Sequence, residues 1–421
     1  MKASDYIVEY LIEKGITDVF GYPGGMVTHL MDSFSKYAGK IAAHLTYHEQ
    51  GAAFAACGYA QASGKVGVAY ATSGPGATNL ITGICDAYFD SIPALFITGQ
   101  VNTFESAGDL KVRQRGFQET DIVSMVSGVT KFAERITDAS RLKWYLDYAF
   151  AAAMDGRKGP VLLDIPMNIF RAEIDPAQME GYAPERASEK QAVQTDPLRD
   201  ALRAAKRPVL LIGSGIKTAN AVDLARSTAK KLGIPTVSTM LAVDVIDDPA
   251  LNYGFIGAYG SRTANFIVAK SDLVISLGAR LDVRQVGAIR RNFAPGAKLL
   301  RVDIDAGELE YKVHDDEIPI QTDVADVLAA LAEIGSPADP TEWLAVCAKI
   351  REELDGRDDR RPNHLLRALS KHLPEDALIT ADVGQNQKII VCTQRRRTFR
   401  NRHHSASPPP GYPALTGRSG R

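Results

Sequence analysis

The sequence predicts an α/β protein made of consecutive doubly wound parallel-sheet domains. Short apolar runs typical of buried strands alternate with helical patterns, and glycine-rich turns separate them. Strands that alternate with helices favour a parallel sheet covered by helices on both faces. The chain has 421 residues, 45 % of them hydrophobic and 24 % charged, which is long enough for two or three such domains.

The first predicted domain covers residues 1–170. Its strands are expected over residues 16–25 (with a turn at the end), 41–47, 66–72, 93–99 and 158–166, and its helices over residues 4–14, 51–64 and 76–90. Residues 171–195 lose this periodicity and are polar, so we expect a linker there.

The second predicted domain covers residues 196–338, with strands expected over residues 208–215, 236–240, 273–281 and 298–305. Residues 339–373 predict a helical connection, and residues 374–387 begin a third strand-and-turn unit. Residues 388–421 contain eight Lys or Arg and no Asp or Glu, against 41 basic and 50 acidic residues before them. Such a composition does not bury enough apolar surface to fold, so we expect a basic disordered tail.

The rest of the composition is that of an ordinary globular protein. The formal net charge is -1, and no apolar run approaches the roughly 18 residues that a membrane-spanning helix needs. Four scattered cysteines form neither a metal-binding spacing nor a disulfide framework. We therefore expect a cytoplasmic protein that does not bind a membrane. A nucleic-acid-binding arm is one interpretation of the basic tail, but we favour an out-of-frame gene end.

The turn GPGATN, residues 74–79, is the first candidate ligand site. It follows a strand that ends at Thr72, and Gly74 and Gly76 permit a close approach of the backbone. The N–H groups at the start of the following helix then lie at the carboxyl edge of the sheet, where α/β folds bind ligands. A tight strand-to-helix turn needs glycines whatever it binds, so this signal alone favours a structural role.

Glu49 is the candidate catalytic group. It follows a predicted buried strand and begins a helix of small residues, so its carboxylate would lose water and could share a proton near neutral pH. The alternative is a purely structural role, in which Glu49 lies in the first turn of a helix and the helix dipole stabilises its charge. The turn FGYPGG, residues 20–25, ends a third strand of the same sheet, and three such turns at one edge favour a site.

Four segments together resemble one enzyme family. FGYPGG, the stretch from His48 to Val101, GFQETDIV and GRKGPVLLDIP are similar in order and spacing to the large catalytic subunit of acetolactate synthase. More broadly, they resemble the thiamine diphosphate-dependent 2-oxoacid enzymes. The resemblance covers about residues 1–387.

The resemblance implies the fold and the chemistry of the family. Its first domain binds the aminopyrimidine of thiamine diphosphate, its middle domain holds FAD, and its third domain binds the diphosphate through Mg²⁺. It also implies a homodimer or tetramer that decarboxylates a 2-oxoacid such as pyruvate and joins the product to a second carbonyl compound, in branched-chain amino acid biosynthesis. The family's active site lies between the first domain of one subunit and the third domain of another.

The resemblance also assigns roles to residues of this chain. Glu49 would hydrogen-bond the pyrimidine nitrogen, Phe117 and Gln118 would face the substrate, and Lys131 would lie near the entrance of the active site. The cofactor-binding residues that it implies are Pro23, Gly24, Gly25, Thr72, Gly74, Pro75, Asn79 and, for FAD, Arg157. It assigns no metal ligand within this sequence.

The sequence departs from the family pattern in three places. The stretch 102–116 is longer than the usual loop, and GARLDVRQVG (residues 278–287) replaces a pattern with Phe and paired acids, which leaves FAD binding open. No Gly-Asp-Gly occurs, although that motif begins the Mg²⁺ site in the family. We therefore expect a truncated third domain and no activity in the chain as written. The alternatives are a sibling 2-oxoacid decarboxylase or lyase and a non-catalytic fragment that binds a full-length relative.

Overall fold

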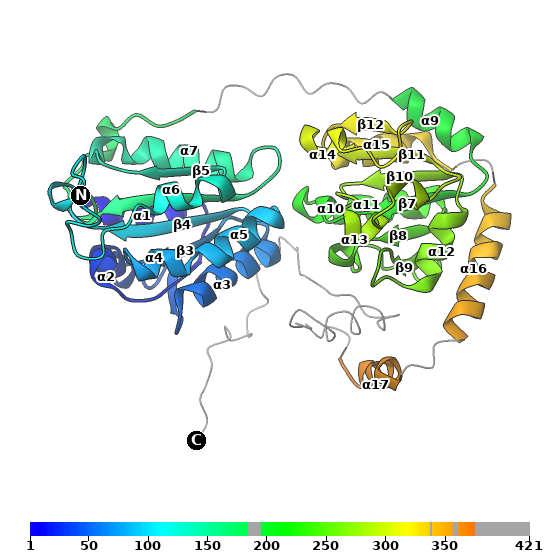
Figure 1. Cartoon of the computed structure of the whole chain (residues 1–421), viewed down its shortest axis with the longest axis horizontal. Helices are drawn as coiled ribbons and strands as arrows, with labels where there is room; N and C mark the ends of the chain where they lie inside the picture. Colours follow the sequence, from blue (N-terminus) through cyan, green and yellow to red (C-terminus); the bar gives the residue numbers. More distant parts are fainter. Residues whose placement is uncertain (184–194, 337–338, 357–360, 375–421) are drawn as a thin grey trace.

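The computed structural model describes residues 1–183, 195–336, 339–356 and 361–374. Within these residues the chain forms two α/β domains, each built around a six-stranded, fully parallel sheet (Figure 1). The predicted fold class is confirmed for these two domains. The predicted third unit beyond Pro374 and the predicted basic tail lie outside the described residues.

The first sheet has the strand order β2-β1-β3-β4-β6-β5. Its strands are β1 Asp18–Gly21, β2 Ala42–Leu45, β3 Gly67–Ala71, β4 Ala94–Gln100, β5 Phe132–Arg135 and β6 Pro160–Pro166. Its helices are α1 Ala3–Glu13, α2 Thr28–Lys36, α3 Glu49–Ser63, α4 Pro75–Asn79, α5 Ile81–Phe89, α6 Ile122–Val126, α7 Leu142–Met154 and α8 Met167–Phe170.

Helices cover both faces of this sheet, so its central strands are buried along their whole length. Every residue of β3, β4 and β6 is buried, as expected for a parallel sheet between two helical layers. Helices α1, α2 and α7 pack on one face, and α3, α5 and α6 pack on the other. The alanine-rich sequence of α3 lets that helix approach the sheet closely: a Cβ on Gly67 would lie 2.0 Å from the carbonyl oxygen of Ala56.

The second sheet has the strand order β12-β11-β10-β7-β8-β9. Its strands are β7 Pro208–Ile212, β8 Thr236–Ser238, β9 Asn252–Phe255, β10 Leu273–Leu277, β11 Lys298–Asp303 and β12 Ile318–Gln321. Its helices are α9 Thr195–Ala204, α10 Gly215–Thr218, α11 Val222–Leu232, α12 Arg262–Lys270, α13 Val283–Val286, α14 Ala306–Glu310 and α15 Val324–Ile334.

The predicted helical connection consists of α16 Thr341–Gly356 and α17 Arg361–Ser370. Helix α16 packs on the second sheet through Trp343 and Cys347, and the indole N–H of Trp343 donates to the carbonyl of Pro208 at 3.1 Å. Arg351 of the same helix lies over the ring of Tyr253, with its guanidinium carbon 3.9 Å from the ring centre. These contacts make α16 part of the middle domain.

The first part of the polar segment after residue 170, for which we expected a linker, packs against the first domain. Met1 and Ile174 exchange two backbone hydrogen bonds, and Lys2 pairs with Glu173 in an antiparallel bridge. Tyr182 packs edge-on against Trp144 and Tyr148 of α7. The first domain therefore holds this segment as far as Tyr182.

Each sheet contains a switch point, where connections lead from neighbouring strands to opposite sides. In the first sheet this switch point lies between β1 and β3, and in the second between β7 and β10. Ligands of open α/β sheets bind outside the carboxyl ends of the strands at such a point. The topology therefore marks two places for sites, one in each domain.

Candidate functional site

The switch point of the first sheet brings the β1 and β3 turns into contact. A Cβ added to Gly24 would lie only 2.4 Å from Cβ of Thr72, so the close approach requires glycine at position 24. The hydroxyl of Thr72 accepts a hydrogen bond from the backbone N–H of Met26 at 3.2 Å. The two turns thus form one wall.

Glu49 is the first residue of α3, and its side chain is 9 % exposed. His48 precedes it as the N-cap, and its Nδ1 accepts from the backbone N–H of Gln50 at 3.1 Å. The Glu49 oxygen Oε2 accepts a hydrogen bond from the amide of Asn79 at 2.9 Å, although the two residues are 30 positions apart. The carboxylate is therefore held in one orientation at the edge of the sheet.

Gly76 leaves room beside the second carboxylate oxygen. A Cβ at position 76 would lie 3.3 Å from Oε1 of Glu49 and 2.8 Å from the methyl group of Thr72. The space beside Oε1 is therefore kept clear by the missing side chain. An acceptor oxygen that is buried, oriented and open on one side can bind a donor N–H of a ligand.

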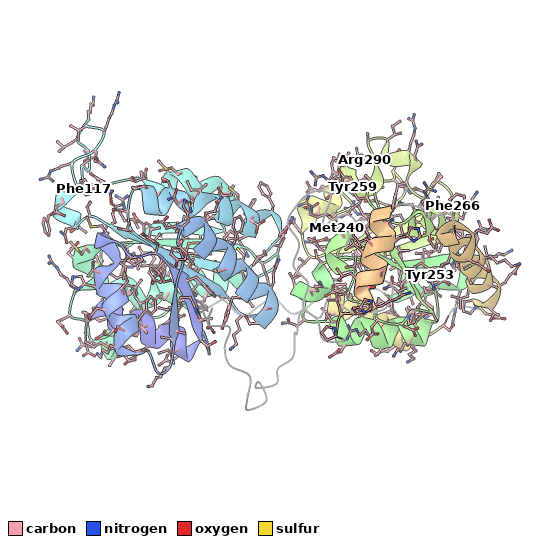
Figure 2. The ribbon with its side chains drawn as sticks, turned by 90° about the horizontal axis from the view of Figure 1, so that it is seen from below. Phe117, Met240, Tyr253, Tyr259, Phe266 and Arg290 are labelled. Carbon is pink, nitrogen blue, oxygen red and sulfur yellow. The ribbon has the colours of Figure 1, made fainter. Side chains whose placement is uncertain are left out.

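Gln118 joins this site through Gly74. A Cβ on Gly74 would lie 2.8 Å from Cβ of Gln118, and Gln118 itself has a φ of 60°, a left-handed conformation that favours glycine. The neighbouring Phe117 is 77 % exposed and lies at the end of the first domain that is remote from the middle domain (Figure 2).

Glu119, which the sequence did not single out, organises the loop before this pair. Its carboxylate accepts from the hydroxyl of Ser106 at 2.6 Å and from the backbone N–H groups of Ala107, Arg115 and Gly116. Burial acts to raise the pKa of Glu119, but these hydrogen bonds outweigh it and lower the pKa to about 2. The feature of the sequence that could have identified Glu119 is its position directly after Phe117 and Gln118.

The structure brings together most of the predicted residues of this edge. Glu49, Asn79, Thr72, Gly74, Gly24 and Gln118 are linked by the contacts above. Pro23, Gly25 and Pro75 lie in the same turns and are exposed.

Lys131 does not lie at this edge. It immediately precedes β5, which runs parallel to β6, and its backbone N–H donates to the carbonyl of Pro160 at the start of β6. Its ammonium donates to the carbonyl of Asp155, and burial lowers the pKa of Lys131. The amino and carboxyl ends of parallel strands lie at opposite edges, so within this chain Lys131 lies at the edge opposite Glu49. Its role near the entrance of an active site that two subunits form stays a prediction.

Arg157 also lies at the amino edge of the first sheet, where it joins the two domains. Its Nη1 donates to Oδ2 of Asp305 at 2.9 Å and to Oε1 of Glu308 at 2.7 Å, and its Nε donates to the hydroxyl of Ser91. Arg280 of the middle domain reaches back to the carbonyl of Phe89 at 3.3 Å. We call Arg157, Arg280, Asp305 and Glu308 the interdomain clasp.

A cavity of about 800 Å³ lies between the amino edge of the first sheet and the carboxyl edge of the second. Its lining includes Arg157, Gly215, Gly278, Arg280 and Asp303. It also includes Met240 and Tyr259, which Figure 2 shows on the middle domain, far from Phe117. The cavity and the Glu49 edge are therefore two separate sites.

The cavity lies at the switch point of the second sheet. The turns after β7 and β10 touch there. A Cβ on Gly215 would lie 2.8 Å from Cα of Gly278, and a Cβ on Gly213 would lie 1.9 Å from the carbonyl oxygen of Gly278. Backbone without side chains lets a ligand come close to the sheet.

Acidic side chains line part of the same cavity. Burial raises the pKa of Asp303, the last residue of β11, and also that of Asp86 and Asp90 from the first domain. Asp303 was not among the predicted site residues. The signal that could have identified it is VDID, an acid at the end of a buried strand.

The described residues contain neither a membrane-spanning helix nor a cluster of metal-ligating side chains. No helix in that part of the chain is long and apolar enough to cross a membrane. In the same residues, no group of three or more His, Cys, Asp or Glu is placed to hold a metal ion.

Comparison with known proteins identifies both domains. Residues 1–125 match the family model described as thiamine pyrophosphate enzyme, N-terminal TPP binding domain, and residues 195–331 match the central domain of the same enzymes. The two domains are thus the N-terminal and central domains of a thiamine pyrophosphate enzyme.

Individual relatives show which family of thiamine pyrophosphate enzymes the chain resembles. The chain is 36 % identical over 393 residues to the acetolactate synthase isozyme 2 large subunit of Escherichia coli K12, covering 92 % of this chain and 69 % of that protein. It is also 36 % identical over 401 residues to the acetolactate synthase large subunit of Lactococcus lactis, covering 92 % of this chain and 68 % of that protein. The chain belongs to the acetolactate synthase large-subunit family.

Proposed function

We propose that this chain is an acetolactate synthase-type subunit, which uses thiamine diphosphate to decarboxylate pyruvate and join the product to a second 2-oxoacid in branched-chain amino acid biosynthesis. The observation that supports this most directly is the pair of Glu49 and Asn79 at the switch point, beside the space that Gly76 leaves open. Thiamine diphosphate, when bound, supplies the carbon nucleophile that attacks the 2-oxoacid carbonyl.

The residues of the first domain fit the aminopyrimidine ring. Oε1 of Glu49 would share a proton with a ring nitrogen, while the amide of Asn79 fixes the carboxylate through Oε2. Because Glu49 is 9 % exposed, little water competes for that proton. Thr72 and Gly24 would form the wall beside the ring, and Gln118 would face the substrate.

The exposed edge around this site is proposed to face a third domain of a second subunit. Tyr47 is 99 % exposed, Leu45 66 % and Phe117 77 %, so the edge holds apolar side chains that water surrounds in the single chain. A covering domain would exclude this water, and in the family it binds the diphosphate through Mg²⁺. We therefore propose a homodimer or tetramer and a Mg²⁺ requirement for tight binding of thiamine diphosphate.

The cavity between the domains is proposed to hold FAD. Its volume of about 800 Å³ lies within the range of small-molecule pockets. The bare backbone at Gly215 and Gly278 permits close approach, and the carboxylate of Asp303 can accept from sugar hydroxyls. Release of flavin fluorescence on denaturation of the purified protein tests this assignment.

Isothermal titration of the full chain with thiamine diphosphate and Mg²⁺ tests the main proposal. Wild type and Glu13→Gln, which changes an exposed glutamate of α1, are expected to bind alike. Glu49→Gln is expected to weaken binding because its amide cannot share the proton. Equal binding by Glu49→Gln would refute the role of Glu49.

A turnover assay with pyruvate then separates the site from the activity. Acetolactate formed only when thiamine diphosphate is present would establish the reaction, with the Escherichia coli relative as a positive control. Binding without turnover would keep the site and refute the activity for this chain.

The loop before Phe117 favours one second candidate, a sibling enzyme with another acceptor substrate. Glu119 anchors this loop against the site, and the loop exposes Lys111 and Arg113. A panel of neutral and anionic carbonyl acceptors distinguishes the two, since only the sibling enzyme would prefer another acceptor over 2-oxoacids.

A further inference from the structure

Arg301 is the largest fully buried side chain of the described residues, at 1 % exposure. It lies in β11 between Leu300 and Val302, which face the opposite side of the sheet and pack in the core beneath α11 and α15. A charged group at such a position needs hydrogen-bond partners. Both terminal nitrogens of Arg301 have them, whereas its buried Nε has none among the described residues. Its partners therefore indicate what it does.

Its guanidinium joins three segments of the middle domain. Nη2 donates to the carbonyl of Arg280 at 3.2 Å and to the carbonyl of Glu308 at 2.9 Å. Nη1 donates to the carbonyl of Tyr311 at 3.0 Å and to Oε1 of Glu317 at 2.9 Å. One planar group thus fixes the backbone after β10 and the backbone of α14 at set positions.

Glu317 extends this network on the other side. It is 5 % exposed, and its Oε2 accepts from the backbone N–H groups of Val313 at 2.9 Å and His314 at 3.2 Å. The carboxylate therefore holds the turn between α14 and β12 while it pairs with Arg301. Arg301 and Glu317 therefore each hold neighbouring backbone in place while they pair with one another.

Two of the carbonyls that Arg301 holds belong to residues of the interdomain clasp. The side chain of Glu308 bonds Arg157 of the first domain at 2.7 Å and lies 3.8 Å from Nε of Arg280. Arg280 in turn lines the cavity and reaches the carbonyl of Phe89. The backbone positions that Arg301 sets are thus those from which the middle domain grips the first.

We propose that Arg301 is a positioning residue for the cavity between the two domains. Its guanidinium holds the backbone of Arg280 and of Glu308 in place, so that the interdomain clasp and the wall of the cavity keep their geometry. Lysine cannot replace it, because one ammonium group on a flexible stem does not present a planar fork to carbonyls on separate segments. The ligand part of this inference rests on the proposed binding of FAD.

The test compares Arg301→Met with Leu300→Ala in the full chain. Leu300 lies on the same strand but faces the opposite core, so its truncation lowers stability without touching the clasp. Hydrogen exchange in segments 280–286 and 308–314, and the dissociation constant for FAD, are measured for both variants. Arg301→Lys keeps the charge but not the planar fork, so it is expected to change both readouts as Arg301→Met does.

We expect Arg301→Met to accelerate exchange in both segments and to weaken FAD binding about tenfold, because the groups that line the cavity are no longer held in one geometry. Leu300→Ala should lower the melting temperature and leave both readouts near wild type. Unchanged exchange in Arg301→Met, or equal changes in both variants, would overturn the inference. If wild type binds no FAD, the flavin proposal fails, while the exchange comparison still decides the role of Arg301.

Discussion

Gly24→Ala is the substitution that tests most sharply how the Glu49 site is built. Gly24 has a φ of -169°, an extended conformation that any residue adopts, so alanine causes no backbone strain there. The added Cβ would lie 2.4 Å from Cβ and 2.6 Å from Cγ2 of Thr72. That is about 1 Å closer than the contact distance of carbon atoms, so one of the two turns has to move.

Overpacking of this kind costs about 1–3 kcal/mol in the free energy of unfolding. For a domain of this size, each kcal/mol lowers the melting temperature by roughly 2–4 °C. Because Thr72 also touches Gly76 beside Glu49, we expect the displacement to weaken thiamine diphosphate binding as well.

Gly25→Ala is the matched control. The neighbouring position has no atom within 4 Å of its added Cβ, so we expect a change within about 0.5 kcal/mol. Calorimetry of both variants measures the melting temperatures. Combining Gly24→Ala with Thr72→Gly removes the clashing atoms and should recover part of the loss. Equal melting temperatures for the two alanine variants would refute the proposed contact between the turns.

Two further predictions concern the loop and the clasp. Glu119→Gln should release the loop of residues 106–116 and speed tryptic cleavage there, whereas the control Asp109→Asn should not, and an unchanged cleavage rate in Glu119→Gln would contradict this. Since the pKa of Glu119 is lowered from 4.5 to about 2, the loop should stay ordered above pH 4.5 and loosen as the pH falls toward 2. Arg157→Met should weaken the contact between the domains by about 1–3 kcal/mol and widen their separation in small-angle scattering. Arg141→Met is the control, because it leaves the clasp intact. An unchanged scattering profile in Arg157→Met would show that the clasp does not hold the domains.

The sequence predicted the central strands well because they are buried on both faces. The runs over β3, β4, β6, β7, β10 and β11 are short, apolar and bounded by turns, so period and length identified them. The edge strands β5, β9 and β12 were missed. FAER in β5 is only partly buried throughout and NYGF contains a glycine, so neither shows a clear apolar run.

Contacts between distant segments could not be derived from sequence patterns. Glu49 and Asn79 were both predicted as site residues, but their hydrogen bond depends on how α3 and α4 meet at the switch point. Arg301 stands in a strand pattern where an arginine usually indicates a solvent-facing position, yet it is fully buried. Its four partners come from three segments that only the packed middle domain brings together.

The two sites lie at opposite edges of the first sheet, and this arrangement has a physical consequence. The middle domain occupies the amino edge, where Arg157 pairs with Asp305 and Glu308. The carboxyl edge with Glu49 keeps its exposed apolar rim, including Tyr47 and Phe117. A parallel sheet separates its edges by the length of its strands, so the middle domain cannot also close the Glu49 site. Chemistry that needs a dry proton transfer at Glu49 must therefore obtain its cover from a different domain, and the thiamine diphosphate titration with and without Mg²⁺ measures whether this chain obtains it.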